Sequence, residues 1–299
     1  MSMTPEIDAG HIARIEAFER SFAVERRKLW LQTAIYGVLL VVAVILSAMF
    51  SGFSFGELMS GLPDAWRYIS STFPELHYAT LGHDLGEWYW NLPRWLELLA
   101  ETALMSFVGT VAGGVAALLL CFSASRNLVH SDIAYFLSRR LLELARTVPD
   151  TVYAMIFVFA FGIGPLAGVL ALAVHTTGSL GKLFSEVNES IDRKPIEGVM
   201  ASGGNWPVIM RLAVLPQVMP NFMSYALLRF EYNIRSASVL GIVGAGGIGE
   251  ELYLSIRQFD YPDISAIVLL IIAVVMAADL SCEAIRHRMI SKESLRYTS

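Results

Sequence analysis

Charged residues are scarce in this chain. Asp, Glu, Lys and Arg together form 16% of its 299 residues, whereas an average soluble domain carries about 25%. Hydrophobic residues reach 55%, and the mean hydropathy is +0.54. A chain with so little charge and so much apolar surface is not an ordinary soluble domain, and we expect its solvent to be a lipid bilayer.

Cysteine, positive charge and repeats are scarce as well. The two cysteines, Cys121 and Cys282, provide no disulfide framework. A net charge of −5 argues against a nucleic-acid partner, which would favour a basic face. Residues 1–28 are polar, and the apolar run after them is too long for the core of a signal peptide. These features exclude secreted disulfide-rich and nucleic-acid-binding proteins.

Several apolar runs have the length of membrane helices, which need about 20 residues to cross a core about 30 Å thick. They cover residues 29–52, 98–122, 150–183, 216–243 and 264–283. The third run is long enough for two helices, and Gly162-Ile-Gly-Pro165 breaks it because proline lacks a backbone donor. The sequence therefore predicts an all-α membrane protein with about six transmembrane helices.

Lys and Arg are concentrated in alternate connecting segments. The basic segments carry Arg14, Arg20, Arg26, Arg27 and Lys28, then Arg126, Arg139, Arg140 and Arg146, then Arg193 and Lys194, and finally Arg286, Arg288, Lys292 and Arg296. Loop 54–92 carries only Arg67 beside several carboxylates. Because cytoplasmic loops are enriched in Lys and Arg, we expect both termini in the cytoplasm, as an even number of helices requires.

Loop 54–92 is also rich in aromatic side chains. These are Trp66, Tyr68, Phe73, Tyr78, Trp88, Tyr89 and Trp90, followed by Trp95. Amphipathic rings favour the headgroup level of a membrane, so an interfacial belt on the outer face is the favoured interpretation. A binding role for these rings is the alternative.

Four polar residues interrupt the run 216–243: Arg229, Glu231, Asn233 and Arg235. At 1.5 Å per residue they lie roughly 20–28 Å beyond Pro216. Charges at membrane depth normally face a bundle interior or a water-filled cavity. They form either a polar pathway for an anionic substrate or an ion-paired lock. The lock is favoured for Glu231, which can pair with Arg235 one turn away or with another helix.

His175-Thr176-Thr177 forms a second polar group within the run 150–183. Threonine hydroxyls in membrane helices often bond only to the carbonyls of the preceding turn. His175 faces either a cavity in the pathway or a satisfied site inside the bundle. We expect no metal site, because no second His or Cys lies at ligand spacing.

The segment Glu197-Gly-Val-Met-Ala-Ser-Gly203, followed by Leu215-Pro216, has a specific spacing. It resembles the cytoplasmic coupling loop of importer-type ABC permeases, E-A-A-x3-G-x9-I-x-L-P. Glu197, Gly203, Leu215 and Pro216 match, whereas Gly198, Val199 and Ala213 depart from the pattern. The resemblance implies a short helix, including Ala201, that fits a groove on a partner ATPase. An ordinary loop with Glu197 as a solvated carboxylate is the alternative.

No segment supports a nucleotide site in this chain. Gly178-Ser-Leu-Gly181-Lys182 lacks the first glycine and the final Ser or Thr of a P-loop. Gly244-Ala-Gly246-Gly247-Ile-Gly249 satisfies G-x-G-x-x-G but follows a membrane helix rather than a strand. We interpret it as a glycine-rich bend at the outer end of that helix. The corresponding place forms the periplasmic gate in type-I permeases.

Longer strings resemble the permease subunit of phosphonate/phosphite ABC importers across most of residues 97–285. They are Arg146-Thr-Val-Pro149-Asp150, Gly162–Gly168, His175–Glu186 and Glu231–Gly249. Related methionine permeases share the glycine-rich end. The resemblance implies a second copy of this chain, a cytoplasmic ABC ATPase dimer that holds ATP and Mg²⁺, and an extracytoplasmic substrate-binding protein. This chain itself would bind no cofactor and catalyse no reaction.

The expected organisation is therefore a permease with an added N-terminal helix. Its parts are a cytoplasmic segment 1–28, an extra helix and outer loop 29–92, the type-I permease domain 93–285 and a cytoplasmic tail 286–299. We expect a multi-pass protein surrounded by lipid in a bacterial plasma membrane, passing phosphonate, phosphite or a related small oxyanion inward.

Three alternatives remain beside this expectation. The first is a permease for another small solute, such as phosphate or a methionine-like compound. The second is an ion-driven transporter that uses Glu231 and His175 as a proton relay; the coupling loop and the lack of an inverted repeat count against it. The third is a membrane enzyme, but the sequence shows neither a nucleophile paired with a base nor a set of metal ligands.

Overall fold

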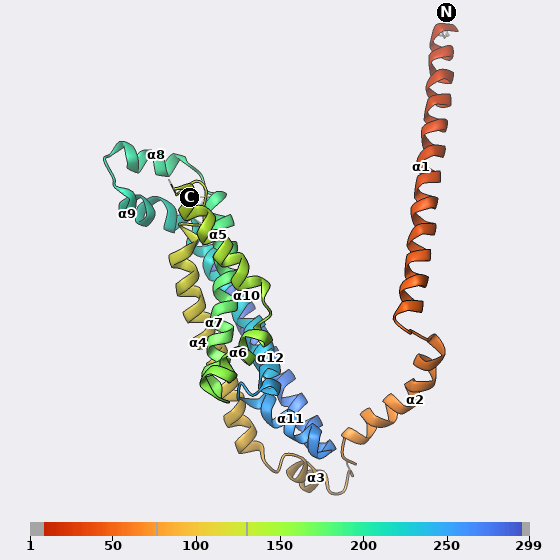
Figure 1. The fold of residues 1–299 in the computed structure, drawn as a ribbon, viewed down its shortest axis with the longest axis vertical. Helices are drawn as coiled ribbons and strands as arrows, with labels where there is room; N and C mark the ends of the chain where they lie inside the picture. Colours follow the sequence, from red (N-terminus) through yellow and green to blue (C-terminus); the bar gives the residue numbers. More distant parts are fainter. Residues whose placement is uncertain (1–8, 76, 130, 295–299) are drawn as a thin grey trace, which may run out of the picture. The chain divides into compact units, whose positions relative to one another are not determined.

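The computed structural model describes residues 9–75, 77–129 and 131–294 (Figure 1). These residues form helices and connecting loops and contain no strand, which confirms the all-α prediction. The chain divides into two compact units, one ending at Ile69 and the other beginning at Ser70.

The N-terminal unit consists mainly of two helices, α1 (Ala9–Phe50) and α2 (Phe55–Thr72). From Glu25 to Phe50, α1 is apolar and long enough to cross a membrane, and none of this span is buried. A helix that is hydrophobic all round requires lipid or other helices around it.

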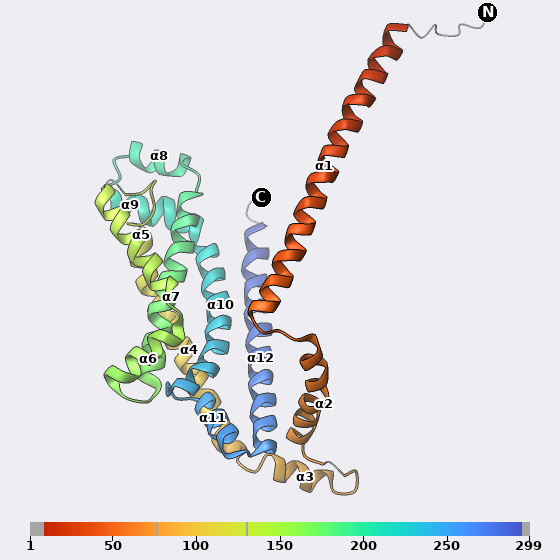
Figure 2. The same cartoon turned by 45° about the vertical axis from the view of Figure 1, so that its right-hand side comes forward.

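The second unit is a bundle of longer helices. It contains α3 (Leu81–Trp88), α4 (Leu92–Cys121), α5 (Asp132–Thr147), α6 (Asp150–Phe161), α7 (Pro165–Glu189), α10 (Leu215–Leu240), α11 (Ile248–Gln258) and α12 (Tyr261–Ser294) (Figure 2). Among the described residues of the whole chain, four helices can cross a membrane alone. The number rises to six if each of two bent pairs forms one span. The expected six helices therefore correspond to the upper limit.

One of the bent pairs corrects the sequence-based boundaries. Residues 132–147 were expected in a connecting loop, but they form α5, which packs along α7. Arg139, Arg140 and Arg146 lower the hydropathy of this helix, although its other face is apolar. After α5 the chain bends by 88° into α6, because Pro149 disfavours the helical conformation at Val148, which is extended.

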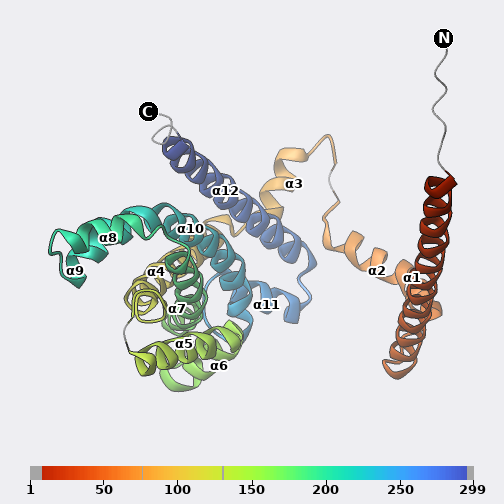
Figure 3. The same ribbon diagram turned by 90° about the horizontal axis from the view of Figure 1, so that it is seen from above.

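Helix α7 lies at the centre of the bundle, with α4, α5 and α10 around it (Figure 3). Glycines of α4 allow this helix to approach α7 closely. A Cβ atom on Gly113 of α4 would lie 2.7 Å from the carbonyl oxygen of Ala173, and one on Gly109 would lie 2.8 Å from the Cβ of Leu172. Small residues at helix crossings bring backbones together in this way in membrane proteins.

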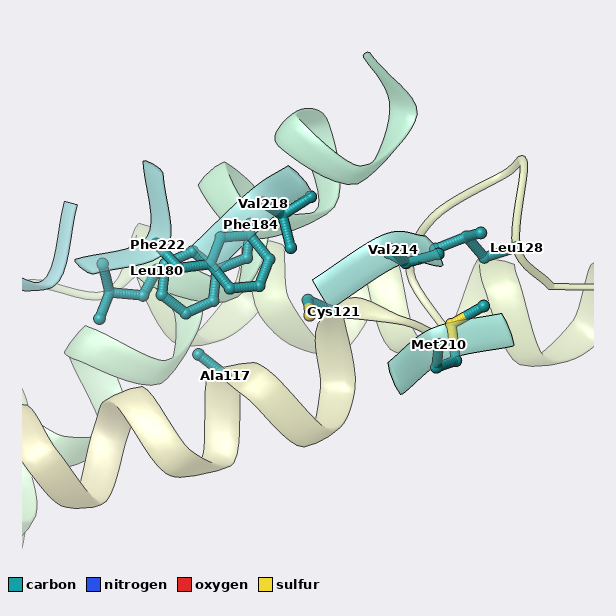
Figure 4. Close-up of a cluster of buried hydrophobic side chains, with 9 residues drawn as sticks. All are labelled: Ala117, Cys121, Leu128, Leu180, Phe184, Met210, Val214, Val218 and Phe222. Carbon is teal, nitrogen blue, oxygen red and sulfur yellow. The ribbon is translucent and has the colours of Figure 1, made fainter. Parts of the chain in front are cut away.

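A buried hydrophobic cluster joins α4, α7 and the start of α10 (Figure 4). Its members are Ala117, Cys121, Leu128, Leu180, Phe184, Met210, Val214, Val218 and Phe222. The rings of Phe184 and Phe222 stack with their centroids 4.0 Å apart. Met210 and Val214 bound a single π-helical turn immediately before α10, so this cluster fixes the place where α10 begins.

Some outer-loop aromatics pack inside the bundle instead of forming a belt. Trp95 is fully buried. Trp88 is buried too, and its Nε1 donates to the carbonyl oxygen of Pro262 at 3.0 Å and to Ser265 Oγ at 3.1 Å. The interfacial interpretation is therefore wrong for Trp88 and Trp95, whose indoles pack near the first turn of α12. Trp66 and Tyr78 are exposed.

Candidate functional site

The segment with the coupling-loop spacing protrudes from one end of the bundle (Figures 1 and 2). It forms α8 (Lys194–Ala201) and α9 (Trp206–Ile209), neither of which contains a buried residue. Glu197 and Gly198 are exposed on α8, and Ala201 ends the helix. Gly203 has φ +83°, a left-handed conformation that favours glycine and that turns the chain between the two helices.

The two ends of this protruding segment are joined at its base. The Asp192 backbone N–H donates to Gln217 Oε1 at 3.1 Å, and Gln217 Nε2 donates to the carbonyl oxygen of Asp192 at 3.4 Å. Leu215 begins α10 and Pro216 lies in its first turn, where a missing N–H costs nothing. The exposed helix α8 is therefore connected directly to the start of a long bundle helix.

Arg229 lies on the face of α10 that contacts α7. Its guanidinium contacts His175 Nδ1 and donates from Nε to Thr176 Oγ1 at 3.3 Å. Arginine can only donate, so Nδ1 of the imidazole is the acceptor in this contact. The Arg229 Cζ atom also lies 4.3 Å from the ring centroid of Tyr232. Within the described parts of the chain, no carboxylate lies at ion-pairing distance from Arg229.

Asn233 extends this polar network to α4. It is fully buried and donates to Thr110 Oγ1 at 2.8 Å and to Thr176 Oγ1 at 2.9 Å. Its Oδ1 atom has no hydrogen-bond partner among the residues that the structure describes. Thr177 instead donates to the carbonyl oxygen of Ala173 at 2.8 Å. The network of Arg229, His175, Thr176, Asn233 and Thr110 thus joins α4, α7 and α10, and Thr177 lies outside it.

The other two charges of α10 pair with α12. Glu231 Oε1 lies 3.6 Å from Arg286 Nη2, and Arg235 Nη2 lies 3.3 Å from Asp279 Oδ1. Residues two apart on a helix project from nearly opposite sides, which separates Glu231 from Arg229. Of the pairings considered for Glu231, the structure contains the one with another helix. Arg229, Glu231 and Arg235 therefore do not share one site.

The glycine-rich bend lies at the end of the bundle opposite α8 (Figure 2). Gly244, Gly246 and Gly247 have φ values of 86°, 79° and 74°, and a Cβ atom on Gly249 would lie 2.0 Å from the carbonyl oxygen of Ser238. Two hydrogen bonds clamp the bend. The Gly164 N–H donates to the Gly244 carbonyl at 2.9 Å, and the Ile248 N–H donates to Thr102 Oγ1 at 3.0 Å. Only glycine fits several of these positions.

A groove of about 510 Å³ lies between α4, α10 and α12. Its walls are almost entirely apolar and include Phe107, Val111, Phe230 and Ile285. An anion would lose its hydration there without gaining a partner. This groove is therefore no candidate for a polar pathway.

Comparison with known proteins identifies the family. The family described as binding-protein-dependent transport system inner membrane component matches residues 109–291. The chain belongs to this family. The match includes the protruding segment, the polar network and the glycine-rich bend. The protein is accordingly a multi-pass inner-membrane permease subunit of an ABC importer, a transport component rather than an enzyme.

Two curated relatives are similar to this permease. One is the phosphite transport system permease protein PtxC of Stutzerimonas stutzeri, 42% identical over 62% of this chain and 67% of that protein. The other is the phosphate-import permease protein PhnE of Mycolicibacterium smegmatis, 38% identical over 64% of this chain and 36% of that protein. The permease is thus of the phosphonate/phosphite kind.

Solved structures support the same fold. The inward-facing MetNI methionine ABC transporter matches with a TM-score of 0.56 and 20% identity, covering 65% of this permease and 95% of that chain. A bacterial ABC transporter for alginate import matches with a TM-score of 0.58 and 13% identity, covering 84% and 95%.

Sequence reasoning missed some members of the polar network. Thr110 lies on α4 between Gly109 and Gly113, and that G-x-x-x-G spacing signals the face that meets α7. Tyr232, which lies beside the network under the Arg229 guanidinium, carried no sequence signal that separates it from other aromatics in the same helix.

Proposed function

We propose that this permease passes phosphonate, phosphite or a related small oxyanion inward, and that Arg229 binds the anion transiently. One observation carries the proposal: Arg229 contacts neutral groups on α7, and no described carboxylate pairs with it. A cation at membrane depth is costly unless it is compensated. An anion in transit would supply the compensation.

The other residues of the predicted pathway support this assignment to different degrees. His175, Thr176 and Asn233 belong to the network around Arg229 and orient its side chain. Arg235 already pairs with Asp279, so an anion gains less from it. Glu231 and Thr177 contact other groups, and we assign them a structural role.

We further propose that α8 is the contact with a cytoplasmic ABC ATPase dimer, which holds ATP and Mg²⁺. The exposed surface around Glu197, Gly198, Ala201 and Gly203 supports this proposal, because an exposed helix is free to enter a groove on a partner. Leu215 and Pro216 then connect the contact to α10. Since α10 also carries Arg229, closure of the ATPases would move the anion site.

The glycine bend at Gly244, Gly246, Gly247 and Gly249 would form the periplasmic gate. Its position opposite α8 supports this assignment, as does the 47° angle between the helices on its two sides. A binding protein would deliver the substrate on this outer side. The concentration of Lys and Arg near both termini favours their cytoplasmic location.

A second copy of the chain would complete the pathway. Tyr232 is 43% exposed in a single copy although it contacts Arg229, and Arg146 is exposed beside Gly178. Polar groups at membrane depth normally face protein or water rather than lipid. A homodimer with this face at its centre would satisfy both residues, and lipid would cover the remaining apolar surfaces.

The test compares two arginines of the same helix. The complete transporter, with its ATPase and binding protein, is reconstituted in vesicles, and phosphite uptake is measured for Arg229→Gln and Arg235→Gln. We expect Arg229→Gln to lower uptake about tenfold, the effect of losing about 1.4 kcal/mol of binding. Arg235→Gln should retain most uptake. Wild-type uptake by an intact Arg229→Gln transporter would refute the pathway.

The ion-driven alternative has little structural support. Glu231 pairs with α12, whereas His175 contacts Arg229, so the described contacts contain no relay that joins Glu231 and His175. Uptake that continues after ATP depletion would favour that alternative over an ATP-driven importer.

A further inference from the structure

Asp150 is a buried carboxylate at the first position of α6. It is 7% exposed, its Oδ1 accepts the N–H of Thr151 at 2.9 Å, and its Oδ2 accepts the hydroxyl of Ser236 on α10. No described cation lies at ion-pairing distance from it. Hydroxyl and amide donors hold this carboxylate in place, but they do not neutralise its charge.

Asp150 lies further along the same face of α10 as Arg229. Residues Arg229, Tyr232 and Ser236 are spaced i, i+3 and i+7, which places them in one stripe. Ser236 is about 10.5 Å beyond Arg229 along the helix axis, and the guanidinium lies over the ring of Tyr232, the residue between them on this stripe. Arg229 and the Ser236 hydroxyl that binds Asp150 therefore lie at two levels of one stripe. Asp150 also acts electrostatically on His175 and Arg229.

The separation of these opposite charges is maintained by other contacts. Arg229 is held by His175 and Thr176, and Asp150 is held by Ser236 and Thr151. A small tetrahedral ion placed between them can accept a charge-assisted hydrogen bond from Arg229 and donate one to Asp150, each about 2.8 Å long.

The charges of Arg229 and Asp150 determine which protonation state of the oxyanion can bind between them. A fully ionised oxyanion on Arg229 would be repelled by the Asp150 carboxylate. An oxyanion that retains one acid proton presents ionised oxygens to Arg229 and an O–H group to Asp150. Phosphate-type oxyanions with a second pKa of about 6 populate both forms near neutral pH.

We propose that Arg229 and Asp150 form a two-sided site that accepts a small oxyanion in its singly protonated form. Arg229 binds the ionised oxygens, and Asp150 accepts a hydrogen bond from the remaining acid O–H. The proposal rests on the anion pathway through Arg229 and adds a selectivity to it. The other titratable or charged groups near the site are His175 on α7, Tyr232 on α10 and Arg146 on α5.

The experiment measures phosphite uptake by the complete transporter in vesicles at external pH values from about 6 to 8.5, a range that spans the loss of the second proton. The informative quantity is the uptake of Asp150→Asn divided by that of the wild type at each pH. Both transporters use the same binding protein, so this ratio cancels its own pH dependence. We expect the ratio to rise about tenfold across the range, because asparagine no longer repels the fully ionised form.

Ser236→Ala is the matched control. It removes a hydrogen bond from Asp150 but keeps the carboxylate. The uptake of Ser236→Ala divided by that of the wild type should therefore be below one by the same factor at every pH. A flat ratio for Asp150→Asn as well would overturn the proposal and leave Asp150 with a packing role. Asp150→Ser is measured in parallel. If neither neutral variant assembles, Asp150→Glu must keep the wild-type pH profile, and a changed profile overturns the proposal.

Two further outcomes separate the possible errors. If Arg229→Gln transports phosphite like the wild type, the anion pathway itself is wrong. If Arg229→Gln loses uptake while the Asp150→Asn ratio stays flat, only the selectivity is wrong. Selective loss of 2-aminoethylphosphonate uptake in Asp150→Asn would overturn the proposal in favour of an ammonium-binding carboxylate.

Discussion

Gly178 of α7 lies against the backbone of Arg146 at the end of α5. A Cβ atom on Gly178 would come within 2.5 Å of the Arg146 nitrogen and 2.7 Å of the Leu142 carbonyl oxygen. The end of α5 is thereby fixed beside the polar network. The bend between α5 and α6, which places Asp150, starts from this contact.

Gly178→Ala should therefore destabilise the permease, because its methyl group meets backbone atoms that cannot move aside. We expect a loss of about 1–3 kcal/mol, the usual effect of overpacking a core. Gly114→Ala is the control, since a Cβ atom there meets only Leu180 Cδ1 at 3.7 Å. Thermal unfolding of the purified permease in detergent measures both. Equal stability of the two variants would contradict the prediction.

Gly203 offers a test of the proposed ATPase contact. Gly203→Val cannot adopt φ +83° without strain of about 1–2 kcal/mol, whereas Gly203→Asn tolerates this conformation. We expect Gly203→Val to lose uptake while ATP hydrolysis by the complex continues, and Gly203→Asn to retain most coupling. Uptake and hydrolysis are measured in the same vesicles. Full uptake by Gly203→Val would remove this turn from the coupling route.

The Glu231–Arg286 contact should contribute to the stability of the bundle. Glu231→Arg places two cations together in a buried position, and we expect a loss of about 3 kcal/mol or more. The double variant Glu231→Arg, Arg286→Glu restores the opposite charges and should recover much of this loss. A double-mutant cycle on thermal unfolding gives the coupling energy. Reversal of the Arg235–Asp279 pair, which is more exposed, should have a smaller effect.

The long helices could be predicted from the sequence because hydropathy alone limits where a chain can cross a membrane. The break at Gly162–Pro165 and the start of α10 at Leu215 also follow from local chemistry, since proline and glycine act on their own backbone. Helix α5 could not be found in this way. Its arginines mask an apolar face that becomes recognisable only when α7 lies against it.

The partners of the membrane charges required the structure. The sequence places Arg229 and Glu231 on different faces of α10, but it does not determine which helix lies opposite each face. Helix packing brings α7 to Arg229 and α12 to Glu231. The sequence also could not predict the hydrogen-bond partners of Trp88, because Pro262 and Ser265 lie far away along the chain.

The close crossing of α4 and α7 restricts how the permease changes conformation. At Gly109 and Gly113 the two helices meet with almost no intervening layer of side chains, so we expect them to move together as one rigid body. We expect the motion to be concentrated at the two bends, the turn before Pro149 and the bend around Gly246. A cross-link that spans either joint would arrest the cycle, whereas a cross-link between α4 and α7 would leave it running.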